Sequence, residues 1–313
     1  MKKILLTGSN GQIGVALAEH LRKIYGANNV TATDIAKVPG SVSEGGPFAI
    51  LDVRDGKAIG ELLASTGADT LIHLAGLLSA KSEMNPQLAW DTNANGLYAA
   101  LEAAREHGCA FFFPSSIAAF GPSTPHKNTP QDTIQHPATI YGIAKVAGEL
   151  LCDYYHLKYG LDTRGVRFPG LISYTAPPGG GTTDYAVHIY RDAVKKGSYV
   201  SYIGKGTYMD MMYMPDALDA VVRLMEADPG KLVHRNGFNI SAMSFEPEEI
   251  AASIRRVIPA FTLTYDVDPA RQAIADSWPD SLDCTAARTE WGFSPEYDLD
   301  TMTKDMLEKL PKA

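Results

Sequence analysis

At 313 residues, the chain is long enough for one large domain or two closely joined ones with a sizeable core. A formal net charge of −8, with basic residues scattered along the chain, argues against nucleic acid or an anionic membrane surface as the main partner. Three widely spaced cysteines without metal-ligand spacing indicate buried thiols in a reducing compartment. No stretch reaches the roughly 20 apolar residues of a membrane span, and the first strand begins at once, so we expect a cytoplasmic protein.

The chain begins with the pattern of a nucleotide-binding unit. An apolar strand at Lys3–Thr7 leads into Gly8-Ser-Asn-Gly11-Gln-Ile-Gly14 and a helix at Val15–Ile24. Glycines at this spacing allow a tight turn, close approach of backbone amides to a diphosphate, and close packing of helix against strand. A second strand, Val30–Thr33, ends at Asp34, whose carboxylate can hold a ribose 2′-hydroxyl and would repel a 2′-phosphate. The pattern predicts a cofactor site that prefers NAD to NADP, rather than a glycine turn without a ligand.

Strands and helices keep alternating as far as residue 168. We expect strands at Phe48–Val53, Thr70–Leu74, Cys109–Ser115 and Asp162–Phe168, and helices at Asp55–Thr66, at Met84–His107 with a break near Pro86 left open, and at Tyr141–Tyr159. Regular βα units of this kind predict an α/β fold with a doubly wound parallel sheet of the Rossmann type. Ligands of such sheets bind beyond the carboxyl ends of the strands, where Leu51-Asp52-Val53 and Leu74-Ala75-Gly76 stand. Asp52 can reach an adenine there, and the small residues let the backbone pass close to a cofactor.

A hydroxyl, a phenol and an amine follow in an order that suits proton transfer. Ser116 comes at the end of an expected strand, and Tyr141 and Lys145 lie one turn apart on one face of the next helix. A fixed cation near a tyrosine favours the phenolate, whose reference pKa is about 10. Because such Tyr-x-x-x-Lys pairs also arise by chance on solvated helices, the functional interpretation depends on the nucleotide-binding pattern that precedes them.

Two further polar side chains have a structural interpretation. We expect His73, inside the fourth strand, to be a satisfied core histidine, because no second metal ligand stands at a useful spacing. Arg167, at the end of the strand at Asp162–Phe168, suits a position near the cofactor and a structural ion pair equally well.

The second half of the chain departs from the regular alternation. A loop rich in Pro and Gly, Tyr174–Thr183, precedes apolar packing residues at Met209–Pro215 and the following expected elements: helices at Asp184–Lys196, Asp216–Glu226 and Ser244–Val257, strands at Gly237–Ile240 and Phe261–Val267, and a short helix up to Trp291. Asp216 is expected to cap its own helix. Without a free linker between the halves, we expect an NAD-binding domain of residues 1–173, with 213–241 returning to it. Residues 174–212 and 242–313 would form a smaller, interleaved α/β cap that binds the substrate.

With the glycine turn, Asp34, Ser116, Tyr141 and Lys145 in this order, the chain resembles the extended short-chain dehydrogenase/reductases over nearly its whole length. The resemblance implies that Tyr141 is the catalytic acid/base and that Ser116 orients the substrate oxygen. Lys145 would lower the pKa of Tyr141 and hold the nicotinamide ribose. The expected NAD site comprises Gly8, Asn10, Gly11, Gln12, Ile13, Gly14, Asp34, Leu51, Asp52, Val53, Leu74, Ala75, Gly76, Tyr141, Lys145, Phe168 and Leu171.

Three later segments make the resemblance more specific. Gly179–Val187, Met211–Asp216 and Trp278–Asp283, the last followed by Trp291-Gly-Phe, resemble the short-chain family of L-threonine 3-dehydrogenases. That family implies NAD-dependent oxidation of the 3-hydroxyl of L-threonine to 2-amino-3-oxobutanoate. It implies no metal, because the zinc-dependent form of the enzyme has a cysteine and histidine arrangement that this sequence lacks.

The residues that would read the substrate are candidates only. We expect substrate binding by Ser79, Ser116, Tyr141, Gly181, Thr182, Thr183 and Asp184, with Asp184 pairing with the ammonium group. Helix capping explains Ser79, Thr182, Thr183 and Asp184 equally well. A nucleotide-sugar epimerase or dehydratase of the same superfamily, and a non-catalytic NAD-binding protein, remain alternatives. By analogy with relatives, we expect a homodimer formed through the helices at about Asp91–His107 and Tyr141–Tyr159.

Overall fold

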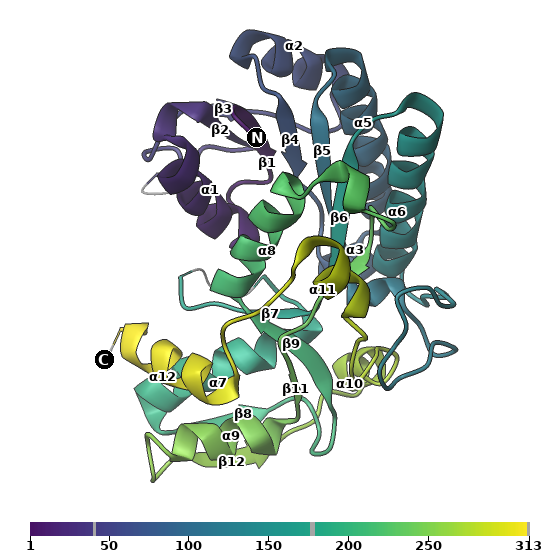
Figure 1. Ribbon diagram of the computed structural model, residues 1–313. Coiled ribbons are helices and arrows are strands. Elements are labelled where there is room, and N and C mark those ends of the chain that lie inside the picture. The colour runs from purple at the N-terminus through teal and green to yellow at the C-terminus, as the bar shows by residue number, and fades with distance from the viewer. Residues whose placement is uncertain (40–41, 176–178, 312–313) are drawn as a thin grey trace.

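The computed structural model describes residues 1–39, 42–175 and 179–311. Within them, seven strands form a parallel sheet in the order β10-β6-β5-β4-β1-β2-β3 (Figure 1). The strands are β1 (Ile4–Thr7), β2 (Val30–Asp34), β3 (Phe48–Ile50), β4 (Thr70–His73), β5 (Ala110–Ser116), β6 (Thr163–Phe168) and β10 (Phe238–Asn239). The predicted doubly wound parallel sheet is confirmed, and with it the return of the chain near residue 238 to the main sheet.

Helices cover both faces of this sheet. On one face lie α1 (Gln12–Tyr25) and α8 (Met214–Glu226), and on the other α2 (Gly56–Thr66), α5 (Gly96–His107) and α6 (Ile140–Tyr159). Neighbouring strand residues point to opposite faces, so Leu5 packs among α2 and α5 whereas Leu6 packs among α1 and α8. Both leucines are fully buried, and each such side chain stabilises the fold by about 1.5–3 kcal/mol.

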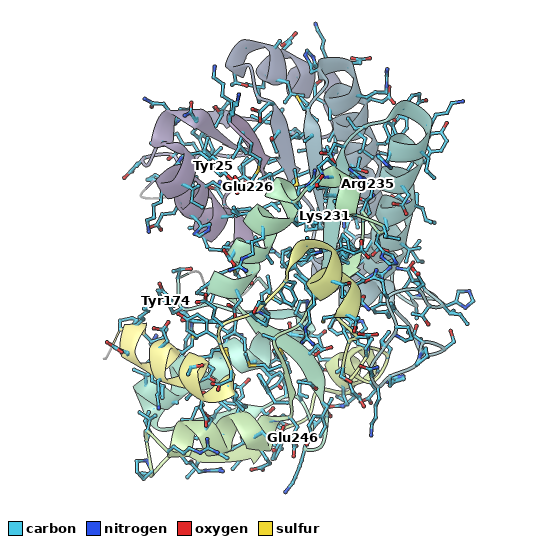
Figure 2. The ribbon with its side chains drawn as sticks, viewed as in Figure 1. Tyr25, Tyr174, Glu226, Lys231, Arg235 and Glu246 are labelled. Carbon is cyan, nitrogen blue, oxygen red and sulfur yellow. The ribbon has the colours of Figure 1, made fainter. Side chains whose placement is uncertain are left out.

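Both helices of the first face also meet through polar side chains at their carboxyl ends. Tyr25, at the end of α1, donates a hydrogen bond to the Glu226 carboxylate at the end of α8 (Figure 2). This contact joins an element from the start of the chain to one that begins about 200 residues later. The parallel sheet is therefore closed on this face by a helix from the second half of the chain.

The lower lobe in Figure 1 contains two small sheets and the remaining large helices. In the described residues, β11 (Met243–Phe245), β9 (Met209–Tyr213) and β7 (Gly170–Ile172) form one sheet, and β12 (Thr262–Tyr265) pairs with β8 (Ser198–Ser201) in the other. Around them lie α7 (Tyr185–Lys196), α9 (Pro247–Arg255), α10 (Pro269–Ala275) and α12 (Leu299–Lys309), while α11 (Thr285–Trp291) packs on β10 of the main sheet. One hydrophobic core runs from the main sheet into this lobe, so the two lobes share a core.

Several predicted elements differ from the structure at their boundaries. The strand expected at Phe48–Val53 ends at Ile50, and the helix expected at Met84–His107 is divided into α4 (Pro86–Trp90), a π-helical segment at Asp91–Asn95, and α5. The break near Pro86 is confirmed, because the Asn85 side chain accepts a hydrogen bond from the Leu88 amide and starts a new helix there. A short helix that was not predicted, α3 (Ser79–Met84), precedes it.

In the second half, the helix expected at Ser244–Val257 begins too early. Met243–Phe245 forms strand β11, and helix α9 starts only at Pro247, with Glu246 and Glu249 forming its capping box. The predicted cap role of Asp216 is also wrong. Its carboxylate accepts hydrogen bonds from the backbone of Glu296 at 2.8 Å and Tyr297 at 3.2 Å, and so fastens the C-terminal segment to α8.

Other segments of the second half agree with their prediction only in part. Met209–Tyr213 is buried and packs in the core as expected, although as strand β9. The loop expected at Tyr174–Thr183 includes residues 176–178, which lie outside the described residues, and ends in a short 3-10 helix at Thr182–Asp184. Among the described residues, no helix is both long and apolar enough to cross a membrane.

Candidate active site

The three predicted catalytic side chains come from the end of one strand and the start of the next long helix. Ser116 is the last residue of β5, and Tyr141 and Lys145 lie in the first two turns of α6. Thr139 caps this helix by accepting a hydrogen bond from the Gly142 amide at 3.0 Å. At Gly142, a Cβ atom would lie 2.2 Å from the carbonyl oxygen of Ala118, so only glycine allows the helix to start this close to the segment after Ser116. Local packing therefore brings the phenol to the hydroxyl.

Hydrogen bonds fix the orientation of the amine and the hydroxyl. The Lys145 ammonium donates to the carbonyl oxygen of Pro114 at 2.6 Å, and its Nζ atom lies 5.4 Å from the centre of the Tyr141 ring. Ser116 Oγ accepts a hydrogen bond from the amide of Ala118 at 3.2 Å, which leaves its own proton free to be donated. The three groups thus present an acid/base, a cation and a hydrogen-bond donor.

Burial dominates the protonation of this group. It raises the pKa of Tyr141 to about 12, against the effect of a hydrogen bond with Ser116, and lowers the pKa of Lys145 to about 8, against the attraction of Glu149. The sequence predicts a lowered pKa for Tyr141, and the structure differs because desolvation of the phenolate outweighs the hydrogen bond with Ser116. Loss of the phenol proton, which oxidation of an alcohol requires, is therefore favoured by alkaline pH.

The glycine turn forms a cradle between β1 and α1. Gly8 has φ of +69°, which few other residues adopt, and a Cβ atom on Gly14 would lie 2.3 Å from the Gly8 carbonyl oxygen. Helix α1 begins at Gln12. Its N-cap residue is Gly11, which has no side chain to accept a hydrogen bond from the first amides of the helix. Asn10, Gln12 and Ile13 complete the turn. The first amides of a helix have no partner within it, so they can bind a diphosphate here.

Asp34 stands beside this turn, at the carboxyl end of β2. One carboxylate oxygen accepts a hydrogen bond from the Asn10 amide at 2.9 Å, and the other accepts from the Ile35 amide at 2.8 Å. Each oxygen keeps a further lone pair, so the carboxylate is held in place and can still accept hydrogen bonds from a ribose.

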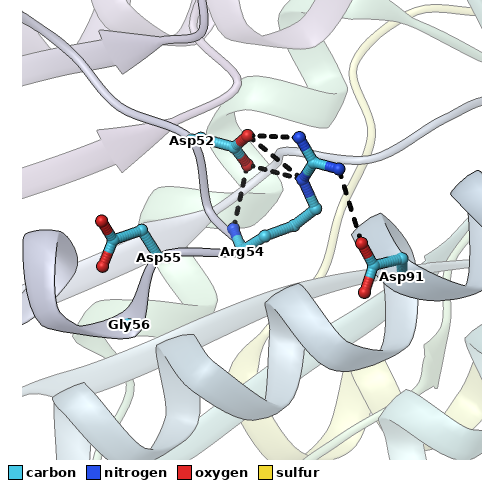
Figure 3. Close-up of a pocket in the computed structure, with 5 residues that line it drawn as sticks. All are labelled: Asp52, Arg54, Asp55, Gly56 and Asp91. Carbon is cyan, nitrogen blue, oxygen red and sulfur yellow. Dashed lines mark hydrogen bonds and ion pairs between the residues drawn. The ribbon is translucent and has the colours of Figure 1, made fainter.

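The segment after β3 forms one rim of the same edge. Asp52 lines a shallow hollow of about 500 Å³ together with Asp91 (Figure 3), while Leu51 and Val53 on either side of it are buried. Arg54 pairs with Asp52 at 2.6 Å and reaches Asp91 at 3.4 Å, and its hydrogen bonds lower the pKa of the Asp52 carboxyl. Arg54 was not among the predicted residues, although an arginine two positions after the acid was visible in the sequence.

The segment after β4 lies against the glycine turn. A Cβ atom on Gly8 would lie 2.6 Å from the Ala75 amide nitrogen, so Leu74 and Ala75 are in close contact with the cradle. The Asn93 side chain, in the π-helical segment, accepts from the Leu77 amide at 2.7 Å and donates to the Leu77 carbonyl at 3.0 Å. Asn93 thereby fixes the loop that begins at Gly76, a role that the sequence did not indicate.

Two predicted cofactor residues come from the β6–β7 edge. Phe168 is the register partner of Ser116 across β5 and β6, and the Gln12 side chain donates to the carbonyl oxygen of Leu171 at 3.4 Å. The edge with the candidate catalytic residues therefore adjoins the glycine turn.

The predicted substrate residues lie in two separate segments. Ser79 is buried at the first residue of α3, which packs on α6, and Gly181, Thr182, Thr183 and Asp184 lie at the start of the second lobe. The Asp184 carboxylate accepts hydrogen bonds from the amides of Gly180 at 2.8 Å and Gly181 at 2.6 Å. Burial raises the pKa of Asp184, and these two hydrogen bonds oppose the rise. Asp184 thus shapes its own loop rather than capping α7.

The two residues with a structural interpretation are both in the interior. His73 is buried, with its Nδ1 atom 3.2 Å from the Thr7 hydroxyl, and burial lowers its pKa to about 3. Arg167 forms a buried ion pair with Glu149 at 2.8 Å, which decides between the two interpretations of this arginine. The described residues contain no group of three or more His, Cys, Asp or Glu side chains that could hold a metal ion, and the three cysteines are free and buried.

Comparison with known proteins places the chain in a well-defined group. Residues 4–240 match the model of the NAD dependent epimerase/dehydratase family. An uncharacterized epimerase/dehydratase of Staphylococcus haemolyticus is 60% identical over 311 residues, which make up 99% of this chain and 98% of that protein. The L-threonine dehydrogenase of Clostridium difficile is 61% identical, with a TM-score of 0.98 over 99% of this chain and 98% of that one. A GalE-like L-threonine dehydrogenase of Cupriavidus necator, in its holo form, is 46% identical, with a TM-score of 0.95 over 98% and 99% of the two chains.

Proposed function

Because the chain belongs to the NAD dependent epimerase/dehydratase family, whose members are extended short-chain dehydrogenase/reductases, we propose that it oxidises the 3-hydroxyl of L-threonine. The product would be 2-amino-3-oxobutanoate. NAD is the cofactor, and the substrate is a small molecule. The observation that carries the proposal is the similarity to L-threonine dehydrogenases over both lobes, together with the contact of Tyr141 with Ser116 and Lys145.

The cradle fits a dinucleotide. The close backbone approach at Gly14 leaves room for a diphosphate, and the first amides of α1 can donate hydrogen bonds to it. The carboxylate of Asp34 can accept hydrogen bonds from the adenine ribose. Asp52 and the segment Leu74–Gly76 would flank the adenine and the nicotinamide side. When bound, NAD supplies the hydride acceptor.

The residues of this chain would handle the proton. The Tyr141 phenolate accepts the proton of the substrate hydroxyl, and the Ser116 hydroxyl donates a hydrogen bond to the same oxygen. With its proton removed, this oxygen supplies the electron density that allows C3 to lose a hydride. The Lys145 ammonium stabilises the phenolate and, through the same charge, would hold the nicotinamide ribose.

The second lobe would recognise the two charges of the amino acid. Asp184 is buried and uses one carboxylate oxygen for Gly180 and Gly181, so its other oxygen is available to pair with the substrate ammonium. Ser79, Thr182 and Thr183 would donate hydrogen bonds to the substrate carboxylate. Residues 174–212 and 242–313 form the substrate-binding region in this proposal, and residues 1–173 with 213–241 form the NAD-binding domain.

The proposal extends to assembly and location. Tyr98 on α5 and Leu150, Tyr154 and Leu157 on α6 are exposed apolar side chains, which suits a homodimer formed through these two helices. The three free, buried cysteines suit a reducing compartment, and we propose the cytoplasm. There the enzyme would act in threonine breakdown, since its product is a β-keto acid that readily loses CO2 or passes to a thiolysis partner.

The names of the curated relatives favour one rival, a nucleotide-sugar epimerase or dehydratase. In the test, the purified chain is incubated with NAD and one candidate substrate at a time. The candidates are L-threonine, L-serine, allo-threonine, UDP-sugars and dTDP-sugars. NADH absorbance should rise with L-threonine, and the sugars should be recovered unchanged. Conversion of a nucleotide sugar without NADH formation from threonine would support the rival.

A further inference from the structure

A buried charge network lies directly behind the candidate catalytic group. Glu149 stands one turn after Lys145 on α6, as Lys145 does after Tyr141, so the three share a face of the helix. Its carboxylate meets the Arg167 guanidinium through Nη2 at 2.8 Å and Nε at 3.0 Å, and both side chains are at most 7% exposed. Removing two charges from water is costly, so a pair kept here needs another reason than stability.

The same carboxylate holds the two segments that carry the catalytic side chains. The hydroxyl of Ser115, the neighbour of Ser116, donates to one oxygen of Glu149, and the side-chain amide of Gln135 donates to the other at 2.8 Å. Ser115 belongs to β5, and Gln135 belongs to the long connection between Ser116 and Tyr141. Glu149 therefore fixes the strand, the connection and the helix relative to one another.

Arg167 extends the network to the sheet edge. Its Nη1 atom donates to the carbonyl oxygen of Gln131 at 2.9 Å and to the Asn239 side chain at 3.0 Å, and its guanidinium lies 4.9 Å from the centre of the Phe120 ring. Gln131 and Phe120 both belong to the segment between Ser116 and Tyr141. Partners other than Glu149 thus hold Arg167, so the arginine stays in place when Glu149 is substituted.

We propose that Glu149 and Arg167 are positioning residues that set the charge of Lys145, with Glu149 as counter-charge to the Lys145 ammonium and Arg167 as the group that limits it. The inference rests on the proposed roles of Tyr141 and Lys145. Neither Glu149 nor Arg167 needs to touch substrate or cofactor.

The charged and titratable neighbours of Lys145 are few. On its own helix they are Tyr141, Glu149 and Cys152, and from β4 the neutral His73 faces it. Glu149 in turn is faced by Arg167 of β6 and by Asp153 one turn further along α6. The attraction of Glu149 raises the pKa of Lys145 against the larger effect of burial, and burial raises the pKa of the Cys152 thiol well above its usual range. Among these neighbours, Glu149 and Arg167 are the charged groups joined to both catalytic segments.

Substituting Glu149 and substituting Arg167 should shift the pKa of Lys145 in opposite directions, which a purely structural role would not produce. Glu149→Gln removes the counter-charge and leaves the positive charge of Arg167 uncompensated, so Lys145 should titrate about one pH unit lower. Arg167→Gln leaves Glu149 uncompensated, and Lys145 should titrate about one pH unit higher. In Glu149→Gln/Arg167→Gln both charges are absent, and the titration should return close to that of the unchanged protein.

The measurement is the nitrogen NMR chemical shift of the lysine Nζ atoms as a function of pH, taken for each variant with and without an added Lys145→Met substitution. The difference isolates Lys145 and needs no substrate. The pH dependence of kcat/KM for L-threonine should move in the same directions. Glu106→Gln, a carboxylate on the neighbouring helix α5 that is paired only at the surface, is the control and should shift neither curve.

Folded single variants that shift in the same direction, or not at all, would overturn the inference. If the ion-pair variants fail to fold, Ser115→Ala decides, because it removes one donor from Glu149 and should raise the titration of Lys145 by a few tenths of a pH unit; an unchanged titration there would contradict the inference. Absence of threonine oxidation by the unchanged chain would refute the proposed function, while the Lys145 titration would still test the charge balance.

Discussion

The parallel sheet and the second lobe differ in how far apart along the chain their paired strands lie. In the main sheet, three pairs of neighbouring strands, β1 and β2, β4 and β5, and β5 and β6, are joined through helices, so their pattern is local. In the second lobe, Met211 pairs with both Gly170 and Met243, and Ser198 pairs with Thr262. Local patterns therefore suffice for the first region, whereas the second depends on pairings that only the folded chain reveals.

The two regions also differ in how they would recognise a ligand. In the proposed function, the cofactor side would rely on the backbone, since the turn at Gly8–Gly14 offers amides and a close backbone approach, with Asp34 held beside it. The substrate side would rely on side chains such as Asp184 that are also part of the loop structure. Substitutions on the two sides should consequently separate cofactor binding from substrate binding.

The largest expected effect is at the junction of the two sides. Tyr141→Phe removes the acid/base and should lower kcat for threonine oxidation by about 10²–10⁴-fold, while NAD affinity is retained. Steady-state NADH formation and NAD titration by fluorescence measure the two quantities. Tyr208→Phe, at an exposed position outside this helix, is the control. Near-normal turnover in Tyr141→Phe would remove this residue from the chemistry.

On the cofactor side, Asp34→Ala should raise the KM for NAD by about 10–100-fold, because charge-assisted hydrogen bonds to the ribose are lost. The same variant should use NADP relatively better, since the repulsion of a 2′-phosphate is gone. The KM for threonine should change little. Glu61→Ala on α2, whose carboxylate is solvent-exposed, serves as the comparison. An unchanged NAD to NADP preference would contradict the ribose role.

On the substrate side, Asp184→Asn should raise the KM for threonine by about tenfold with NAD affinity unchanged, because the amide cannot balance the ammonium charge. Asp192→Asn on α7, a surface residue paired with Lys196 at 3.0 Å, provides the matched control. If Asp184 only shapes its loop, thermal stability will fall without a selective effect on threonine. That outcome would break the proposed division between backbone and side-chain recognition.

The smallest effect concerns the contact between the sheet and the C-terminal segment. His234 lies between Glu290 of α11, at 2.5 Å, and Asp132, at 3.2 Å. Burial lowers the pKa of His234, but both carboxylates oppose it, and the net shift is upward from 6.5. The folded state therefore holds the proton more tightly, so this contribution is complete below pH 6.5 and is lost as the pH rises through the folded-state pKa.

His234→Asn should accordingly lower the free energy of unfolding by ~1 kcal/mol at pH 6 and by less at pH 9. Urea unfolding at the two pH values measures the difference. Asp132→Asn should have a smaller effect, because this carboxylate is 86% exposed. An equal loss for His234→Asn at both pH values would mean that packing, not charge, is responsible.

The contrast between the regions explains what could be predicted. The elements of the cofactor side could be predicted because the glycine turn and the strands that end at Asp34 and Ser116 each follow a local pattern, and the sheet that joins them has a regular order. Asp216 was misjudged because an acid in the first turn of a helix resembles a cap, whereas its partners Glu296 and Tyr297 are 80 residues away. Strands of three or four residues such as β8 and β11 carry too few side chains to show a period of two.

The residues that sequence reasoning missed act through others. Asn93 fixes the loop after Gly76 and Arg54 engages Asp52, and neither belongs to a pattern that predicts its partner. Glu149 lies one helical turn beyond Lys145, a spacing that was visible, but its pairing with Arg167 required the register of β5 and β6. The strands and helices that carry the candidate site residues were thus easier to predict than the hydrogen bonds that join these elements.

We propose above that this active centre oxidises L-threonine with NAD. The most direct test of this claim is NADH formation by the purified chain and by Tyr141→Phe, measured side by side across a range of L-threonine concentrations at alkaline pH. We predict saturable NADH formation by the unchanged chain and a loss of about 10²–10⁴-fold in the variant. No NADH from L-threonine with a chain that still binds NAD, or equal rates from the two proteins, would contradict the claim.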